Sequence, residues 1–233
     1  MHRLGFTRSS HQTDHLLVTP DTFVRAARPG MQNATAIVHV SPAVGAQFTE
    51  YTAEFAAGGC LGPTECERFV FVLEGEVAVD VVALQAEGYA YLPPGSQARV
   101  TARAPARAVV IEKIYDGPTP PPLLTGDARS VESQALMGDE DLQVRVLIPE
   151  GPAFDFAVNT MTFQPGAALG MVEMHVMEHG LLMLDGGGIY RLGEKWYPVT
   201  AGDFIWMAPY CPQWFGALGK TPARYLIYKD WNR

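Results

Sequence analysis

The chain has 233 residues, 48% of them hydrophobic, which is enough to bury a core in one large or two small domains. The formal net charge of −8 and the lack of a basic run argue against nucleic-acid and acidic membrane partners. No apolar stretch approaches the roughly 18 residues of a membrane helix. Three cysteines without a disulfide pattern, and an N-terminus without an apolar signal core, predict a cytoplasmic protein.

In chain order, the predicted elements are those of an all-β protein, because short β-branched and aromatic runs alternate with turns rich in Gly and Pro. Residues 1–35 read as an N-terminal arm with too few apolar residues for a core of its own. A first barrel is predicted over 36–114 and a Pro- and Gly-rich linker over 115–140, with one helical turn expected at 135–142. A second barrel is predicted over 141–233. We expect the arm to pack on another barrel, in a homo-oligomer.

An internal repeat supports this division into two barrels. Residues 67–75 align with 178–186, and residues 88–94 align with 202–209, at displacements of about 111 and 114 residues. The first copy of each pair is rich in β-branched and aromatic residues, which favours strands. A duplicated β domain explains both alignments.

The second copy carries a cluster of metal-ligand residue types. Glu173, His175 and His179 lie within seven positions, and Gln213 follows eleven residues after Gly202. On a strand, Glu173 and His175 would point to the same face. Neutral imidazoles with one carboxylate and one amide oxygen form a ligand set for a borderline divalent ion. The sequence therefore predicts a metal site here.

The first copy lacks these residue types. The repeat places Gly62, Thr64, Arg68 and Arg99 at the four equivalent positions, and two arginines would repel a cation. We therefore expect a barrel without metal ligands, with a structural role or a surface for anions or a partner.

Two competing interpretations involve the same region. His175, Glu178 and His179 fit the H-x-x-E-H signature of a zinc protease, which requires a helix, whereas the repeat predicts strands. Cys211 lies two residues before Gln213. A catalytic thiol there remains open, with packing as the preferred role because no triad partner is evident.

The order and spacing of these ligands resemble the cupin family, with Glu, His and His permuted relative to the usual His, His and Glu. The runs VEMHVMEHGLLML and APYCPQWF are more closely similar to the two-cupin ureidoglycine aminohydrolase family. That resemblance implies two jelly-roll barrels, a Mn²⁺ cofactor and ammonia release from the small-molecule substrate (S)-2-ureidoglycine in allantoin degradation. It implies metal ligation by Glu173, His175, His179 and Gln213, and substrate contacts from Tyr190, Tyr225 and Lys229.

The residues themselves bear partly on these roles. Tyr225, Ile227 and Lys229 would share one face of a strand, so an inward Ile227 brings Lys229 inward as well. An inward lysine next to a cation needs an anion, and a substrate carboxylate would satisfy both charges. We expect Lys229, together with Glu173, to be catalytic. Other metal-dependent cupin enzymes, such as a dioxygenase or an isomerase, and a non-catalytic binder of small molecules remain as alternatives.

Overall fold

The computed structural model describes residues 5–230. Apart from three short 3-10 helices, the regular elements in this part of the chain are β-strands, which confirms the predicted all-β class. No helix among the described residues has the length and hydrophobicity needed to cross a membrane. The chain divides into two compact units, one comprising residues 24–131 and 147–155 and the other residues 5–23, 132–146 and 156–230. We call them the N-terminal unit and the C-terminal unit.

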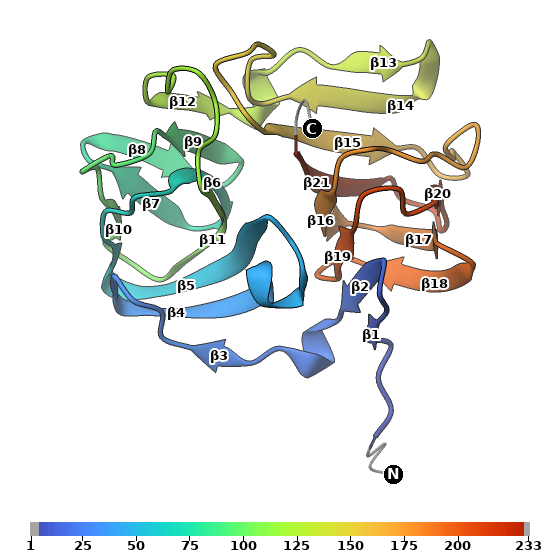
Figure 1. Cartoon of the computed structure of the whole chain (residues 1–233), viewed down its shortest axis with the longest axis horizontal. Coiled ribbons are helices and arrows are strands. Elements are labelled where there is room, and N and C mark those ends of the chain that lie inside the picture. The colour runs from blue at the N-terminus through green and yellow to red at the C-terminus, as the bar shows by residue number, and fades with distance from the viewer. Residues whose placement is uncertain (1–4, 231–233) are drawn as a thin grey trace. The chain divides into compact units, whose positions relative to one another are not determined.

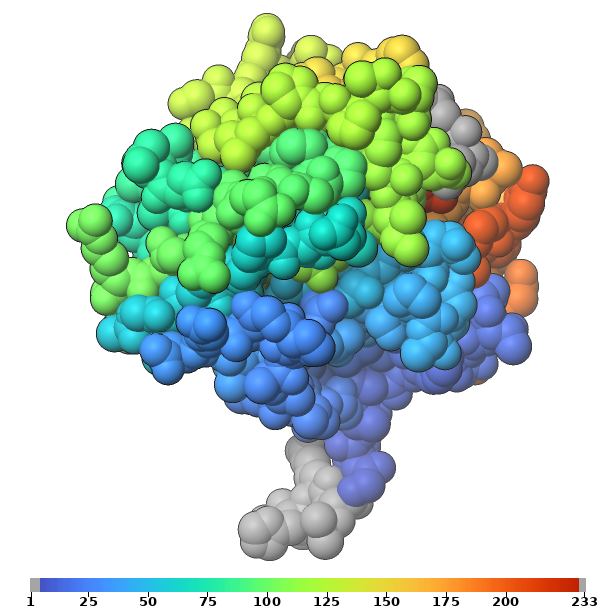
Figure 2. All heavy atoms as spheres, turned by 60° about the vertical axis from the view of Figure 1, so that its left-hand side comes forward, coloured from blue at the N-terminus to red at the C-terminus, as the bar shows by residue number. Residues whose placement is uncertain are grey.

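The N-terminal unit is one curved sheet in the order β12-β9-β6-β11-β5-β10-β7-β8, with β4 paired to β5 and β3 to β4. Its core is lined by alternate residues of these strands, which are buried on the inner face. Figure 2 views this unit from one side, where residues 25–130 form the blue-to-green surface. Its strands are β3 (Arg25–Ala26), β4 (Met31–Val40), β5 (Phe48–Leu61), β6 (Glu67–Glu74), β7 (Glu76–Val79), β8 (Val82–Gln85), β9 (Gly88–Leu92), β10 (Val100–Ala102), β11 (Ala106–Lys113) and β12 (Leu124–Asp127), and its 3-10 helices are Pro42–Val44 and Ala128–Ser130.

The C-terminal unit contains a sheet in the order β1-β2-β19-β16-β21-β15-β14-β13 and a second sheet, β18-β17-β20. Side chains from both sheets form one apolar core cluster. In Figure 1 the blue strand β2 lies beside β19, with which it pairs. The elements are β1 (Ser10–His11), β2 (His15–Val18), the 3-10 helix Pro20–Thr22, β13 (Gln134–Leu136), β14 (Asp139–Val146), β15 (Ala157–Phe163), β16 (His179–Asp185), β17 (Gly187–Leu192), β18 (Lys195–Thr200), β19 (Phe204–Met207), β20 (Gln213–Ala217) and β21 (Ala223–Lys229).

The unit boundaries differ from the expected ones in two places. The arm expected over 1–35 is divided, because residues 5–23 belong to the C-terminal unit and the chain from Val24 to the N-terminal unit, while residues 1–4 of the expected arm lie outside the described residues. Residues 147–155 belong to the N-terminal unit, although the second barrel was expected from 141. Asp155 attaches the segment 147–155 to the rest of the N-terminal unit, because its carboxylate accepts hydrogen bonds from Lys113 Nζ at 2.6 Å and from Asp116 N at 2.8 Å.

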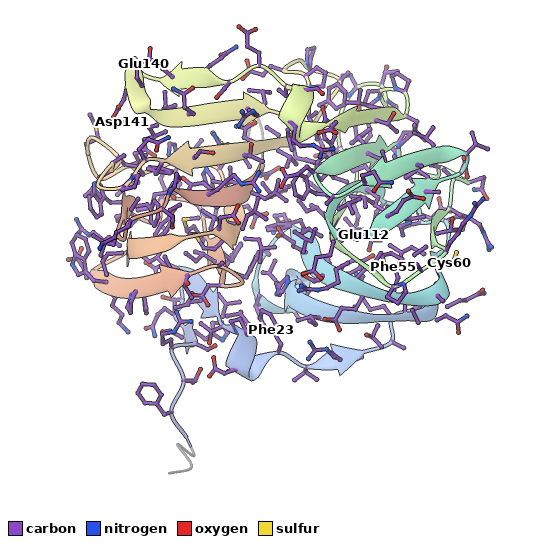
Figure 3. The ribbon with its side chains drawn as sticks, turned by 180° about the vertical axis from the view of Figure 1, so that it is seen from behind. Phe23, Phe55, Cys60, Glu112, Glu140 and Asp141 are labelled. Carbon is purple, nitrogen blue, oxygen red and sulfur yellow. The ribbon has the colours of Figure 1, made fainter. Side chains whose placement is uncertain are left out.

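The helical turn expected at 135–142 is wrong. The segment forms the hairpin between β13 and β14, whose turn end is marked by Glu140 and Asp141 in Figure 3. Met137 and Gly138 both have positive φ, 53° and 84°. Two consecutive residues in the left-handed region are typical of a tight hairpin turn and incompatible with a right-handed helix.

The strand registers show the repeat directly. Arg68 pairs across the sheet with Leu92 and Glu112, and His179 pairs with Met207 and Lys229 in the same pattern. The repeat alignment of Arg68 with His179 is therefore confirmed. Glu112, which is labelled in Figure 3, stands at the position equivalent to Lys229.

The expectation for Arg99 is wrong. Val79 and Tyr190 lie four residues after the equivalent glycines Gly75 and Gly186, and they pair with Val100 and Phe215 respectively. Ala98 lies two residues before Val100, and Gln213 lies two residues before Phe215. The residue of the first barrel equivalent to Gln213 is therefore Ala98, not Arg99. Ala98 is buried and Arg99 is exposed, because a slip of one residue moves a side chain to the other face of a strand.

Candidate metal centre

Glu173 and His175 lie on an extended segment that precedes β16. Residues 173 and 175 are half-buried while 172, 174 and 176 are exposed, so the expected alternation is present. Glu173 forms an isolated bridge with Gln213, the first residue of β20, through two reciprocal N–H···O bonds of 2.8 Å. This backbone pairing brings together two ligand candidates that are forty residues apart.

The two histidines lie next to Glu173. His175 Nε2 is 3.1 Å from Glu173 Oε2, and the rings of His175 and His179 are 5.1 Å apart between centroids. His179 is buried, and burial, with the charges of Lys229 and His175, lowers its pKa to about 3. It is therefore neutral near pH 7, which is the protonation state that binds a metal.

The side chain of Gln213 is held in place by a hydrogen bond from Tyr190. The buried Tyr190 hydroxyl donates to Gln213 Oε1 at 3.2 Å. Burial, followed by the charge of Glu173, raises the pKa of Tyr190. Tyr225 is also buried, and its pKa is raised by burial, Tyr190 and Glu173. Both tyrosines thus remain hydroxyl donors on the Glu173 side of the barrel.

Lys229 is the last residue of β21 and pairs across the sheet with His179. Tyr225 and Ile227, at alternate positions on the same strand, belong to the inner core cluster. Lys229 is half-buried, and its charge contributes to the lowered pKa of His179. The ammonium group is therefore close enough to the histidine to affect it electrostatically.

A cavity of about 220 Å³ opens beside Glu173. It is smaller than the pockets of about 300–1,000 Å³ that take drug-sized ligands, so its size suits a small molecule. Its wall comes from the β13–β14 hairpin and from the loop before Glu173. The lining residues are Leu136, Met137, Asp139, Leu142, Ala168, Leu169, Gly170, Met171 and Glu173.

The zinc-protease interpretation is wrong for this segment. It is extended rather than helical, so His175 and His179 do not share a helical face. Glu178, which would be the general base, is buried and accepts from Trp206 Nε1 at 2.9 Å. This glutamate has a structural partner instead.

The structure also assembles a group that sequence reasoning missed. Among the described His, Cys, Asp and Glu side chains, Asp14, His15 and Cys211 place three ligand atoms within 4.8 Å of one another. Glu173, His175 and His179 do not meet that spacing in the structure. No motif links Asp14 and His15 to Cys211, because they lie at opposite ends of the chain and meet through the pairing of β2 with β19.

Comparisons with known proteins agree with this fold. Residues 159–228 match the cupin domain family. The chain is 43% identical to the (S)-ureidoglycine aminohydrolase of Arabidopsis thaliana, with 98% of this chain and 80% of that protein covered. It is 34% identical to the Escherichia coli (strain K12) protein of the same name, with 93% and 88% covered. The crystal structure of the protein Ylba from E. coli superposes with a TM-score of 0.86 at 29% identity, over 97% of this chain and 95% of that one.

The all-β fold and the matched cupin domain thus define a cupin protein. More closely, the chain belongs to the (S)-ureidoglycine aminohydrolase family, as identity over nearly its whole length shows. It is an enzyme, a hydrolase that acts on a carbon–nitrogen bond. The resemblance seen in the ligand motif and the APYCPQWF run is confirmed.

Proposed function

We propose that the chain converts (S)-2-ureidoglycine and water to (S)-ureidoglycolate and ammonia, with Mn²⁺ held by Glu173, His175, His179 and Gln213. The observation that carries the proposal is the meeting of these residues in one barrel that also presents Lys229 beside His179. The proposed substrate is the one given in the names of the relatives, which are (S)-ureidoglycine aminohydrolases.

The donor set fits a divalent cation. Two imidazoles, one carboxylate and one amide oxygen, without a thiolate, suit Mn²⁺ better than a structural Zn²⁺ site. The Tyr190 bond uses one lone pair of Gln213 Oε1 and leaves the second available to a cation. When bound, the cation supplies Lewis-acid charge neutralisation at the reacting centre.

Lys229 and the two tyrosines would bind and orient the substrate. The half-buried Lys229 ammonium suits the substrate carboxylate, because a charge-assisted hydrogen bond between them is strong. The Tyr225 hydroxyl is a donor with a raised pKa, so it can bond to a substrate oxygen without ionising. The Tyr190 hydroxyl donates to Gln213, so its oxygen can accept a hydrogen bond from a substrate N–H. A substrate held at its carboxylate would present the amine-bearing carbon to the Glu173 side of the barrel.

Proton transfer completes the chemistry of the proposal. Water replaces the amine on this saturated carbon: the new carbon–oxygen bond forms as the carbon–nitrogen bond breaks, the Glu173 carboxylate accepts a proton from the water, and the amine leaves as ammonia after gaining a proton. Lys229 can supply that proton while it holds the carboxylate. Because these residues come from β21 and from the segment that β20 pairs with, the barrel itself sets the geometry.

An assay on freshly prepared ureidoglycine tests the proposal. We expect ammonia and (S)-ureidoglycolate in equal amounts, without oxygen uptake. Oxygen uptake with bound iron would instead indicate a cupin dioxygenase, and binding without turnover would indicate a small-molecule binder.

Assembly and compartment also belong to the proposal. We propose a cytoplasmic homo-oligomer. The three free cysteines, Cys60, Cys66 and Cys211, are consistent with a reducing compartment. A monomer in light scattering at micromolar concentration would contradict the assembly.

A further inference from the structure

Asp14, His15 and Cys211 form a second cluster of metal-ligand side chains, outside the site described above. One ligand atom from each lies within 4.8 Å of the other two. His15 begins β2 and pairs with Met207 of β19, and Cys211 lies on the loop that connects β19 to β20. The cluster contains a thiol, whereas the proposed Mn²⁺ site does not.

The backbone around the cluster is fixed by hydrogen bonds. Ala208 N donates to Asp14 O at 2.9 Å, and Gly193 N donates to Pro212 O at 2.8 Å. A Cβ at Gly193 would lie 2.9 Å from Asp14 Oδ2, so any larger residue here would push the carboxylate aside. These contacts hold the carboxylate, the imidazole and the thiol against one another.

Both ring nitrogens of the His15 imidazole have a partner that orients the ring. Its Nε2 lies 2.8 Å from Tyr197 Oη, and its Nδ1 lies 2.8 Å from Asp14 Oδ1. A metal-binding histidine usually donates its other ring N–H to a nearby acceptor, which fixes the tautomer and the ring orientation. In the metal-free protein Nδ1–H donates to the Asp14 carboxylate, which has no proton to give, and Tyr197 Oη donates to Nε2. Metal binding at Nδ1 would move the ring proton to Nε2, which then donates to Tyr197 Oη.

We propose that Asp14, His15 Nδ1 and the Cys211 sulfur bind one Zn²⁺ ion, with water in the fourth position. A carboxylate, an imidazole and a thiolate are ligands that zinc takes in tetrahedral sites. On binding, the Cys211 sulfur loses its proton to solvent and forms the metal–sulfur bond, without any redox change. The Asp14 side chain is 43% exposed and that of His15 3%, so the ion enters past the carboxylate.

Cobalt(II) titration of the purified full-length protein tests the proposal. Co²⁺ replaces Zn²⁺ in such sites, and a thiolate ligand adds a near-ultraviolet sulfur-to-cobalt absorption that nitrogen and oxygen ligands do not give. We expect this absorption to appear and saturate as Co²⁺ is added to protein whose Glu173 site is already filled with Mn²⁺, and to disappear when Zn²⁺ is added. Co²⁺ at the Glu173 site would give no such band, because that site has no sulfur ligand. The band therefore reports on the Cys211 cluster alone.

Variants identify the ligands. Cys211→Ser should abolish the band, whereas Cys60→Ser and Cys66→Ser should keep it. Tyr197→Phe removes only the partner of Nε2 and should weaken Zn²⁺ binding about 10- to 100-fold. Asp14→Asn should also weaken it, and provides an independent arm if Cys211→Ser fails to fold.

Three outcomes would overturn the proposal. They are the absence of a sulfur-to-cobalt band in the wild-type protein, a band that survives Cys211→Ser in a folded variant, and Zn²⁺ affinity that is unchanged in both Asp14→Asn and Tyr197→Phe. Each would reduce the cluster to a hydrogen-bonded anchor for the β19–β20 loop.

Discussion

Lys229 is the residue whose substitution most clearly separates substrate binding from metal binding, because it lies beside His179 without belonging to the ligand set. A charge-assisted bond to a carboxylate is worth about 1.5–3 kcal/mol. Lys229→Met should therefore lower kcat/KM roughly 10- to 100-fold, and further if the lysine also transfers a proton. Steady-state kinetics with metal analysis checks this, with the exposed Lys195→Met as the matched control. Kinetics as in the control would remove Lys229 from the site.

Tyr190 acts on a proposed metal ligand through a single bond. Its hydroxyl donates to Gln213 Oε1 at 3.2 Å, so Tyr190→Phe frees the amide to rotate while the ring still packs against Phe215. Loss of such an orienting partner typically weakens metal affinity about 10- to 100-fold. Mn²⁺ titration followed by electron paramagnetic resonance measures this. Tyr225→Phe keeps the Gln213 bond and should bind Mn²⁺ more tightly than Tyr190→Phe, and equal affinities would contradict this role.

Sequence spacing was sufficient to predict which residues meet when they lie in one segment. It was insufficient for residues that come from distant segments. The closeness of Glu173 and His175 follows from their position two residues apart on an extended chain. The Asp14 and His15 pair has no such signal, since its contact with Cys211 depends on which strand β2 joins. The prediction for Arg99 failed for another reason. The sequence alignment was shifted by one residue, and such a shift assigns a side chain to the wrong face of its strand.

At the scale of elements, the tight turn after β16 depends on Gly186. Its φ is 65°, and an added Cβ would lie 2.4 Å from the carbonyl oxygen of Pro222. We expect Gly186→Ala to lower the free energy of unfolding by roughly 2–5 kcal/mol, since the left-handed backbone cost adds to a backbone clash. Urea denaturation measures the change. Gly166 has a φ of 87° but open space where a Cβ would lie, so Gly166→Ala should lower the free energy of unfolding by only about 1–2 kcal/mol. Similar losses in the two variants would show that the clash has no effect.

The repeated element also explains why the first barrel carries no equivalent metal cluster. At the register of His179 and Lys229 it has Arg68 and Glu112, whose Nη2 and Oε1 atoms are 2.7 Å apart. Tyr51 Oη donates to the same carboxylate oxygen, and Arg28 donates to the other oxygen. An internal ion pair thus occupies the position at which the second barrel has His179, a proposed metal ligand, and Lys229. The sequence indicated the arginine, whereas its partner Glu112 required the strand register.

For the whole molecule, a buried acid predicts a limit to stability at high pH. Burial raises the pKa of Glu50 to about 8 from 4.5. The neutral form is favoured by folding, so its contribution is fully present below pH 4.5 and is lost as pH rises towards 8. Relative to the wild type, Glu50→Gln should gain roughly 3 kcal/mol of unfolding free energy between pH 5.5 and 7.5.

Urea denaturation at the two pH values measures this gain. Glu76→Gln, an exposed substitution on β7, controls for the loss of one carboxylate. A difference between Glu50→Gln and the wild type that stays constant with pH would show that Glu50 ionises normally.

The all-β class and the duplication followed from composition and from repeated strands, because both are properties of local sequence. The division of the chain between the units did not follow. The chain up to Phe23 and the segment 147–155 are assigned by strand pairing and by the Asp155 ion pair with Lys113, which no local pattern encodes. Long-range pairings of this kind depend on the finished fold.

The most direct test of the central claim joins the candidate metal centre to the reaction. Protein stripped with a chelator is titrated with Mn²⁺ while ammonia release from fresh ureidoglycine is followed, in the wild type and in a folded His179→Gln variant. We predict that wild-type activity returns and saturates at one Mn²⁺ per chain, and that the variant stays inactive at the same concentrations. Full ammonia release by the stripped protein, or full recovery of the variant, would contradict the account.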